Sequence, residues 1–113
     1  MTIGSFYTSG LCLTAPVALP DGVTVTEMLA VLWDNDPQRD TEAGLWQYPL
    51  GANSETRHTT ITTSGSTSGW QFFNNAGLSV VVDNESSSYF IVVCTSDFGR
   101  QGSVQAVQLF YTN

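Results

Sequence analysis

Three aspartates in one short segment are the residues whose types and spacing best suit a chemical role. Asp34, Asp36 and Asp40 supply carboxylates, and the backbone carbonyls of Asn35 and Gln38 lie between them. Hard cations such as calcium take oxygen ligands of this kind. The segment is not an EF-hand loop, which needs a glycine at its sixth position and a bidentate glutamate at its twelfth. It predicts either a calcium site or a turn in which Asp and Asn side chains bond their own backbone.

Aromatic side chains form the second candidate site, because exposed rings can stack on sugar rings. Trp46 and Tyr48 are two positions apart and share one face of a predicted strand, and Trp70 begins another predicted strand. These three residues predict a carbohydrate-binding site, with a cation at Asp34 and Asp36 as an aid. The alternative is that the large rings fill the core between two sheets.

Residues for catalysis are sparse. His58 is the only histidine, and no Gly-x-Ser-x-Gly motif accompanies it, so a serine triad is not indicated. Glycoside hydrolysis needs two carboxylates at a set distance. The candidates for such a pair are Glu27, Glu42, Glu55 and Glu85. Nothing in the sequence selects two of them, although Glu27 interrupts an apolar face and is the acid to check for burial. We therefore predict that the protein is not an enzyme.

The two cysteines, Cys12 and Cys94, lie near opposite ends of the chain, each in an apolar run typical of a strand. Two interpretations stay open. A disulfide closing so long a loop would stabilise the fold by about 4 to 5 kcal/mol in the chain-entropy model. Alternatively, two buried thiols would act as small apolar side chains. Two cysteines are too few for a structural zinc site.

Length and charge limit the classes of protein and of partner. A chain of 113 residues suits a single domain, residues 1–113, large enough for a two-layer core. Ten acidic residues against three arginines give a formal net charge of -7, which repels nucleic acid and anionic lipid. Only 12% of the residues are charged, so the predicted surface is rich in hydroxyl and amide groups.

Neither a signal peptide nor a membrane span is predicted in this sequence. The first residues, Met1–Phe6, lack the basic and apolar regions of a secretory signal. No apolar run approaches the roughly 20 residues that a membrane-spanning helix needs. We therefore expect no membrane insertion.

Alternation with a period of two residues recurs along the chain and predicts an all-β fold. Eight strands are predicted, at residues 11–19 with a bend at Pro16, 23–33, 43–48, 57–63, 70–73, 78–82, 89–95 and 104–111. Turn-rich segments separate them at 34–40, 49–54, 64–69, 83–88 and 96–102. No connection is long enough for a crossover helix, so we predict an antiparallel β-sandwich similar to a jelly roll.

The longest predicted strand follows a turn signal. Leu19–Gly22 reads Leu-Pro-Asp-Gly and predicts a hairpin turn, because proline fixes its own φ and glycine accepts a positive φ. In the strand that follows, strict alternation puts five apolar residues on one face, with Glu27 among them. They are Val23, Val25, Leu29, Val31 and Trp33.

The chain resembles a group of bacterial secreted β-sandwich proteins. Members carry an Ala-Pro-Val-x-Leu-Pro-x-Gly-Ala-Thr-Val-Thr motif and then an Asp-Asn-Asp loop. Ala15–Thr26, with Val23 in place of the usual alanine, and Asp34–Asp36 match these two features. Further similar segments are Gly44–Tyr48, Ser64–Gly69, Val82–Tyr89 and Val107–Tyr111. The resemblance implies an extracytoplasmic β-sandwich and brings no catalytic residues with it; the absent signal peptide departs from the pattern.

The sequence as a whole predicts a non-enzymatic structural or interaction module. We expect it to form a homo-oligomer or a surface assembly, extracellular or at the cell surface, because low surface charge makes an interface easier to desolvate. The alternative is a carbohydrate-binding domain, assisted by calcium, with a glycan as its partner. A small hydrolase is the third alternative.

Overall fold

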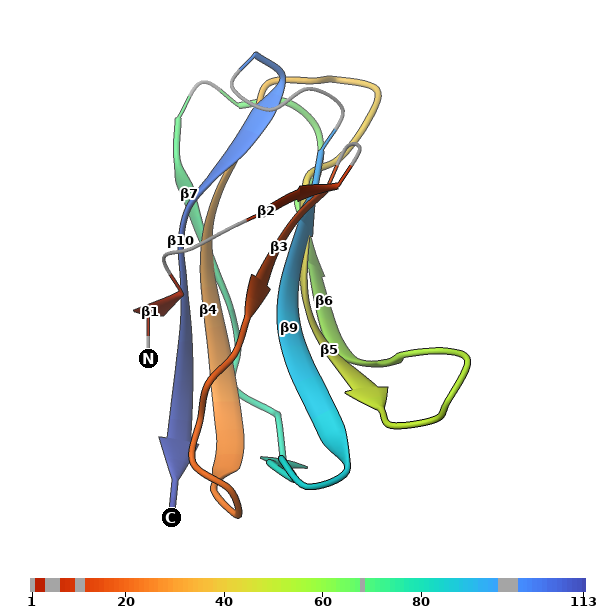
Figure 1. The fold of residues 1–113 in the computed structure, drawn as a ribbon. Helices are drawn as coiled ribbons and strands as arrows, with labels where there is room; N and C mark the ends of the chain where they lie inside the picture. The colour runs from red at the N-terminus through yellow and green to blue at the C-terminus, as the bar shows by residue number, and fades with distance from the viewer. Residues whose placement is uncertain (1, 4–6, 10–11, 68, 96–99) are drawn as a thin grey trace.

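Two antiparallel β-sheets packed face to face make up the fold (Figure 1). The structure, a computed structural model, describes residues 2–3, 7–9, 12–67, 69–95 and 100–113, and within them every regular element is a strand. Sheet A contains β1 (Thr2–Ile3), β10 (Gly102–Thr112), β4 (Thr24–Asp34), β7 (Gln71–Asn75) and β8 (Val80–Val81). Sheet B contains β2 (Tyr7–Ser9), β3 (Cys12–Pro16), β9 (Ser87–Cys94), β5 (Glu42–Pro49) and β6 (Thr56–Thr62). The predicted all-β sandwich is confirmed.

The pairing of the strands is nested, which is the hallmark of a jelly roll. The antiparallel pairs are β1 with β10, β3 with β9, β4 with β7, and β5 with β6, so early strands pair with late ones. Successive pairs alternate between the two sheets, giving the orders β1-β10-β4-β7 and β3-β9-β5-β6. These eight strands form the jelly roll predicted from the sequence.

Some strand boundaries differ from the sequence prediction. The predicted strand 11–19 ends at Pro16, and the predicted strand 78–82 is reduced to β8. The sequence predicted no strand before residue 11, where β1 and β2 lie. Leu11 and most of the predicted turn at 96–102 fall outside the described residues.

The turn at Leu19–Gly22 is present but does not form the predicted hairpin. Gly22 has a positive φ of 86°, as the sequence predicted. However, the turn joins β3 of sheet B to β4 of sheet A. Its hydrogen bonds explain the difference, because the Gly22 N–H donates to the Val82 carbonyl and the Val82 N–H donates to the Val23 carbonyl, both at 2.8 Å. The turn therefore fixes a crossing between the two sheets.

A β-bulge in β4 makes the predicted face of that strand wrong. Glu27 lies opposite Phe110 and Val25 lies opposite Tyr111, so Thr26 is an extra residue in the ladder. An extra residue reverses the alternation of faces. Val25 and Met28 are consequently both buried between the sheets. The bulge lets both halves of β4 turn apolar side chains into the core, whereas strict alternation would have turned those of one half outward.

The core lies between the two sheets and is built mainly from aliphatic side chains. Its largest fully buried apolar members are Met28, Leu32, Leu45, Ile91 and Leu109. Tyr89 is the buried aromatic residue of this core, and its hydroxyl accepts a hydrogen bond from the Asp83 N–H at 2.9 Å. Because aliphatic residues fill the core, most large aromatic rings are left at the surface.

Candidate functional site

The carboxylate of Asp34 is buried at the end of β4, with 1% of the residue exposed. It accepts hydrogen bonds from the Thr63 hydroxyl at 2.5 Å and from the Asp36 N–H at 2.8 Å. Thr63 in turn accepts a hydrogen bond from the Thr41 N–H at 2.8 Å. The Thr41 hydroxyl lies 2.9 Å from that of Thr95. This buried polar cluster ties β4 to the ends of β5, β6 and β9.

The predicted calcium site is not assembled by this geometry. Within the described ranges, no three His, Cys, Asp or Glu side chains form a group that could hold a metal ion. Asp34 points into the polar cluster, while Asp36 accepts a hydrogen bond from the Gln38 N–H at 2.9 Å and Asp40 is exposed. The turn interpretation accounts for the segment, because its side chains bond its own backbone.

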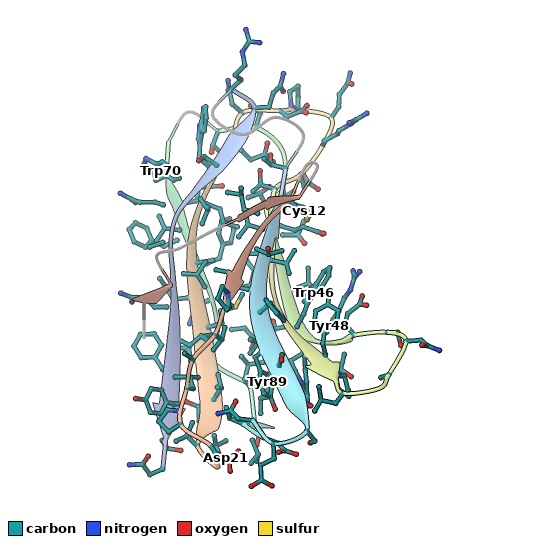
Figure 2. All side chains as sticks on the ribbon, in the orientation of Figure 1. Cys12, Asp21, Trp46, Tyr48, Trp70 and Tyr89 are labelled. Atoms are coloured by element: carbon teal, nitrogen blue, oxygen red, sulfur yellow. A yellow bond between two sulfur atoms is a disulfide. The ribbon has the colours of Figure 1, made fainter. Side chains whose placement is uncertain are left out.

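The three aromatic residues predicted to bind a ligand are split between the two sheets (Figure 2). Trp46 and Tyr48 lie on the outer face of sheet B, with ring centroids 6.4 Å apart. Trp70 lies on the side of sheet A, where its ring centroid is 6.4 Å from that of Trp33. Spacing within one strand predicts that Trp46 and Tyr48 share a face. It does not predict where either of them lies relative to Trp70, which belongs to another part of the chain.

Phe90 is the site residue that sequence reasoning missed. It lies on β9 opposite Trp46 on β5, and its ring meets that of Tyr48 edge to face at 5.5 Å and 86°. Together with Thr14 and Val92, Tyr48 and Phe90 line a hollow of about 290 Å³ on the outer face of sheet B. The signal in the sequence was the alternation of Ser88, Phe90 and Val92, but only strand pairing shows which residues lie beside them.

Charged groups flank this hollow on the side of β6. The Arg57 guanidinium lies 4.1 Å from the centroid of the Trp46 ring, in a cation–π contact. Arg57 also donates a hydrogen bond to Glu55 at 2.9 Å. A backbone hydrogen bond, followed by the bond from Arg57, lowers the pKa of Glu55 below its ordinary value. The aromatic hollow therefore has a paired cation and anion at one edge.

The outer face of sheet A also exposes large apolar side chains. Phe72, Trp70 and Phe110 are exposed by 74%, 45% and 44%, respectively. Val31, which is buried, pairs with Phe72 in the ladder. Glu27 is the charged residue that β4 places on this face, and Asn74 donates a hydrogen bond to it at 3.0 Å. We call Trp70, Phe72, Phe110 and Val31 the apolar face of sheet A.

His58 lies at the margin of the space between the sheets, in a chain of hydrogen bonds. Its Nε2 is 2.7 Å from the side-chain oxygen of Gln47, and the Gln47 amide nitrogen donates to the Ser87 hydroxyl at 2.7 Å. An amide oxygen only accepts, so His58 donates from Nε2. Burial lowers the pKa of His58 below its ordinary value of 6.5.

The candidate glutamates are dispersed over the fold. Glu27 lies on sheet A and is partly exposed, so it is not the buried acid that its position in an apolar pattern suggested. Glu42 and Glu55 belong to sheet B and its β5–β6 hairpin, and Glu85 lies in the loop before β9. The four candidate acids are therefore spread over both sheets and a loop, and Glu55 is the one that lies in the same hairpin as His58.

Acidification is expected to weaken the fold through His58. Because the folded chain holds the pKa of His58 below 6.5, the unfolded chain binds a proton there more readily. The stability that the fold gains from keeping His58 neutral is fully present above about pH 6.5. It is lost as the pH falls toward the pKa of His58 in the folded chain. Chemical denaturation between pH 7.5 and 5 should show this loss in the wild type, and His58→Gln should reduce it. An equal pH dependence in the two proteins would assign the effect to other groups.

Cys12 and Cys94 are joined by a disulfide, so the first of the two interpretations left open by the sequence is the one present. The two residues lie directly opposite each other on β3 and β9. The bond closes a sequence separation of 82 residues. Neighbouring strands from the two ends of the chain are thus covalently linked.

Negative charge is concentrated at the two ends of the sandwich. One group of acids is in the β4–β5 loop, and the other is in the loops before β4 and before β9, at the opposite end (Figures 1 and 2). The first group is Asp34, Asp36 and Asp40, and the second is Asp21, Asp83 and Glu85. The described parts of the broad outer faces carry few charges.

Among the described residues, no helix is long and apolar enough to cross a membrane. Comparison of the chain with protein-family models, with curated proteins and with solved structures finds no match.

Proposed function

We propose that the protein is a non-enzymatic interaction module that self-associates through the apolar face of sheet A. The observation that carries this proposal is the exposure of Phe72 by 74%, together with the exposure of Trp70 and Phe110 on the same side of sheet A. In an antiparallel sandwich with both outer faces in water, outward positions are normally polar. Several large apolar side chains exposed on one face of a sheet indicate a protein interface.

The distribution of charge supports a second copy of the chain as the partner. A formal net charge of -7 would oppose association if it were spread evenly over the surface. Six of the ten acids instead lie at the two ends, so the outer face of sheet A itself carries little negative charge to oppose a second copy. Glu27, the charged residue that β4 adds to this face, is paired with Asn74.

We place this module outside the cytoplasm, in an extracellular or cell-surface assembly. The Cys12–Cys94 disulfide supports this proposal, since structural disulfides persist mainly in oxidising compartments. The resemblance to secreted β-sandwich proteins points the same way.

Replacing Phe72 by serine is expected to weaken self-association by about tenfold or more, because the most exposed ring of this face is lost from the interface. Leu50→Ser is the matched control. Leu50 is exposed by 72%, but it follows the end of β5, which is a strand of sheet B, and so it is not part of the apolar face of sheet A. Sedimentation and light scattering at high micromolar concentration measure the change. A wild-type protein that stays monomeric, or equal weakening by the two variants, would contradict the proposal.

A further inference from the structure

We propose that the hollow on the outer face of sheet B is a binding site for a neutral saccharide. The hollow is lined by Thr14, Tyr48, Phe90 and Val92, with Trp46 beside Tyr48. It lies on the opposite sheet from the face proposed for self-association, so the two functions are independent. It differs from the ligand site predicted from the sequence, because it includes Phe90, excludes Trp70 and needs no cation.

The shape of the hollow suits a sugar ring. Tyr48 and Phe90 meet at 86° and form a corner with two aromatic walls. The C–H face of a pyranose can stack on one ring while its edge contacts the other. A volume of about 290 Å³ lies just below the usual range for small-molecule sites, so it suits a ligand group as small as one sugar ring.

Strand register surrounds the aromatic corner with hydroxyl groups. Thr14 and Gly44 flank Val92 on the two neighbouring strands, and Thr60 follows Gly44 on β6. Ser88 lies opposite Tyr48. Hydroxyls both donate and accept hydrogen bonds, so they match the hydroxyls of a sugar. An apolar centre with a few surrounding polar groups is the usual composition of a small-molecule site.

Charge favours a neutral ligand over an ionic one. The net charge of -7 disfavours anionic ligands at long range. The Arg57 guanidinium at the margin is already paired with Glu55 at 2.9 Å, so neither charge is left to select an ion. Both groups keep hydrogen-bonding capacity toward sugar hydroxyls, since a guanidinium has five N–H donors and a carboxylate accepts several bonds.

Gly44 is the positioning residue of this site. A Cβ atom at Gly44 would lie 2.7 Å from Nε1 of Trp46 and 3.0 Å from the Thr59 carbonyl oxygen. The absence of a side chain thus lets the indole lie across this position, next to Tyr48. Gly44→Ala should displace the indole and alter the margin of the hollow, without removing any of the rings that line it.

The test is titration of the full chain with neutral tetrasaccharides, followed by calorimetry and by tryptophan fluorescence. The probes are cellotetraose, mannotetraose, galactotetraose and chitotetraose. We expect at least one of them to bind the wild type. We also expect Tyr48→Ala and Phe90→Ala each to weaken that binding by about tenfold, as removal of a stacking ring predicts. Gly44→Ala should weaken binding less and change the fluorescence response.

Phe72→Ser serves as the control on the opposite sheet, and it should bind saccharide like the wild type even where it no longer self-associates. Thermal unfolding establishes that each variant is folded, and Tyr48→Phe, which retains the ring, should keep most of the affinity.

The proposal is overturned if none of the four probes binds, or if Phe72→Ser weakens binding as much as Tyr48→Ala. Binding of a proline-rich peptide at these residues, with none of the sugars, would also overturn it. A protein that does not self-associate can still bind saccharide in this titration. The experiment therefore tests saccharide binding independently of the proposal on self-association.

Discussion

Removing the Cys12–Cys94 disulfide is expected to lower the free energy of unfolding by about 4 to 5 kcal/mol, the largest effect of any change considered for this protein. The bond spans 82 residues, and a cross-link stabilises mainly by restricting the unfolded chain, more so for longer loops. It also holds β3, one of the short strands near the N-terminus, against β9. The measurement is chemical denaturation of Cys12→Ala/Cys94→Ala against the wild type, at low micromolar concentration.

A reducing agent provides the internal control for this prediction. It should destabilise the wild type to about the level of the double variant and leave the double variant unaffected. If the double variant loses less than about 1 kcal/mol, strand pairing between β3 and β9 must already supply most of the stability, and the chain-entropy account fails for this fold.

Asp34→Ala is expected to cost about 3 kcal/mol of stability, because each hydrogen bond to a charged group contributes about 1.5 to 3 kcal/mol. The substitution leaves the buried Thr63 hydroxyl and the Asp36 N–H without their acceptor. It also leaves a space where the ends of four strands, β4, β5, β6 and β9, meet. Thermal and chemical unfolding of the variant measure the loss.

Asp40→Ala is the matched control for Asp34→Ala. It removes one carboxylate from the same loop and changes the net charge equally, but Asp40 is exposed. We expect its effect to stay within about 0.5 kcal/mol, as for most surface substitutions. Equal losses from the two variants would show that loop charge matters more than the buried cluster. A calcium-dependent rise in the stability of the wild type would revive the metal interpretation of this segment.

The turn at Leu19–Gly22 shows which structural features a local sequence pattern predicts and which it does not. Proline and glycine fixed the local conformation, and Gly22 indeed has a positive φ. The direction in which β4 leaves the turn depends on hydrogen bonds to Val82, a residue about 60 positions away in the sequence. Turn chemistry is local, whereas the choice between hairpin and crossing is a property of long-range pairing.

The β4 bulge and the aromatic residues show the same limit. Period-two alternation identified the strand, but one extra residue at Thr26 reversed the faces, and nothing local to Thr26 marks a bulge. Likewise, Trp46 and Tyr48 could be related within one strand, whereas Phe90 joined them only through the pairing of β5 with β9. Residues of one strand share a face by covalent geometry, but residues of different strands share it only through register.

By itself, the sequence determined the class of this protein: alternating apolar residues and frequent turn residues specify an antiparallel β-sandwich, because both patterns act over a few residues. Only the tertiary structure decided which chemistry the side chains can do. It buried Asp34 among threonines instead of in a metal site, paired Cys12 with Cys94, and built the sheet B hollow from three strands. The physical reason is that each of these features joins residues far apart in the chain, and such contacts depend on strand order and register, which no local pattern encodes.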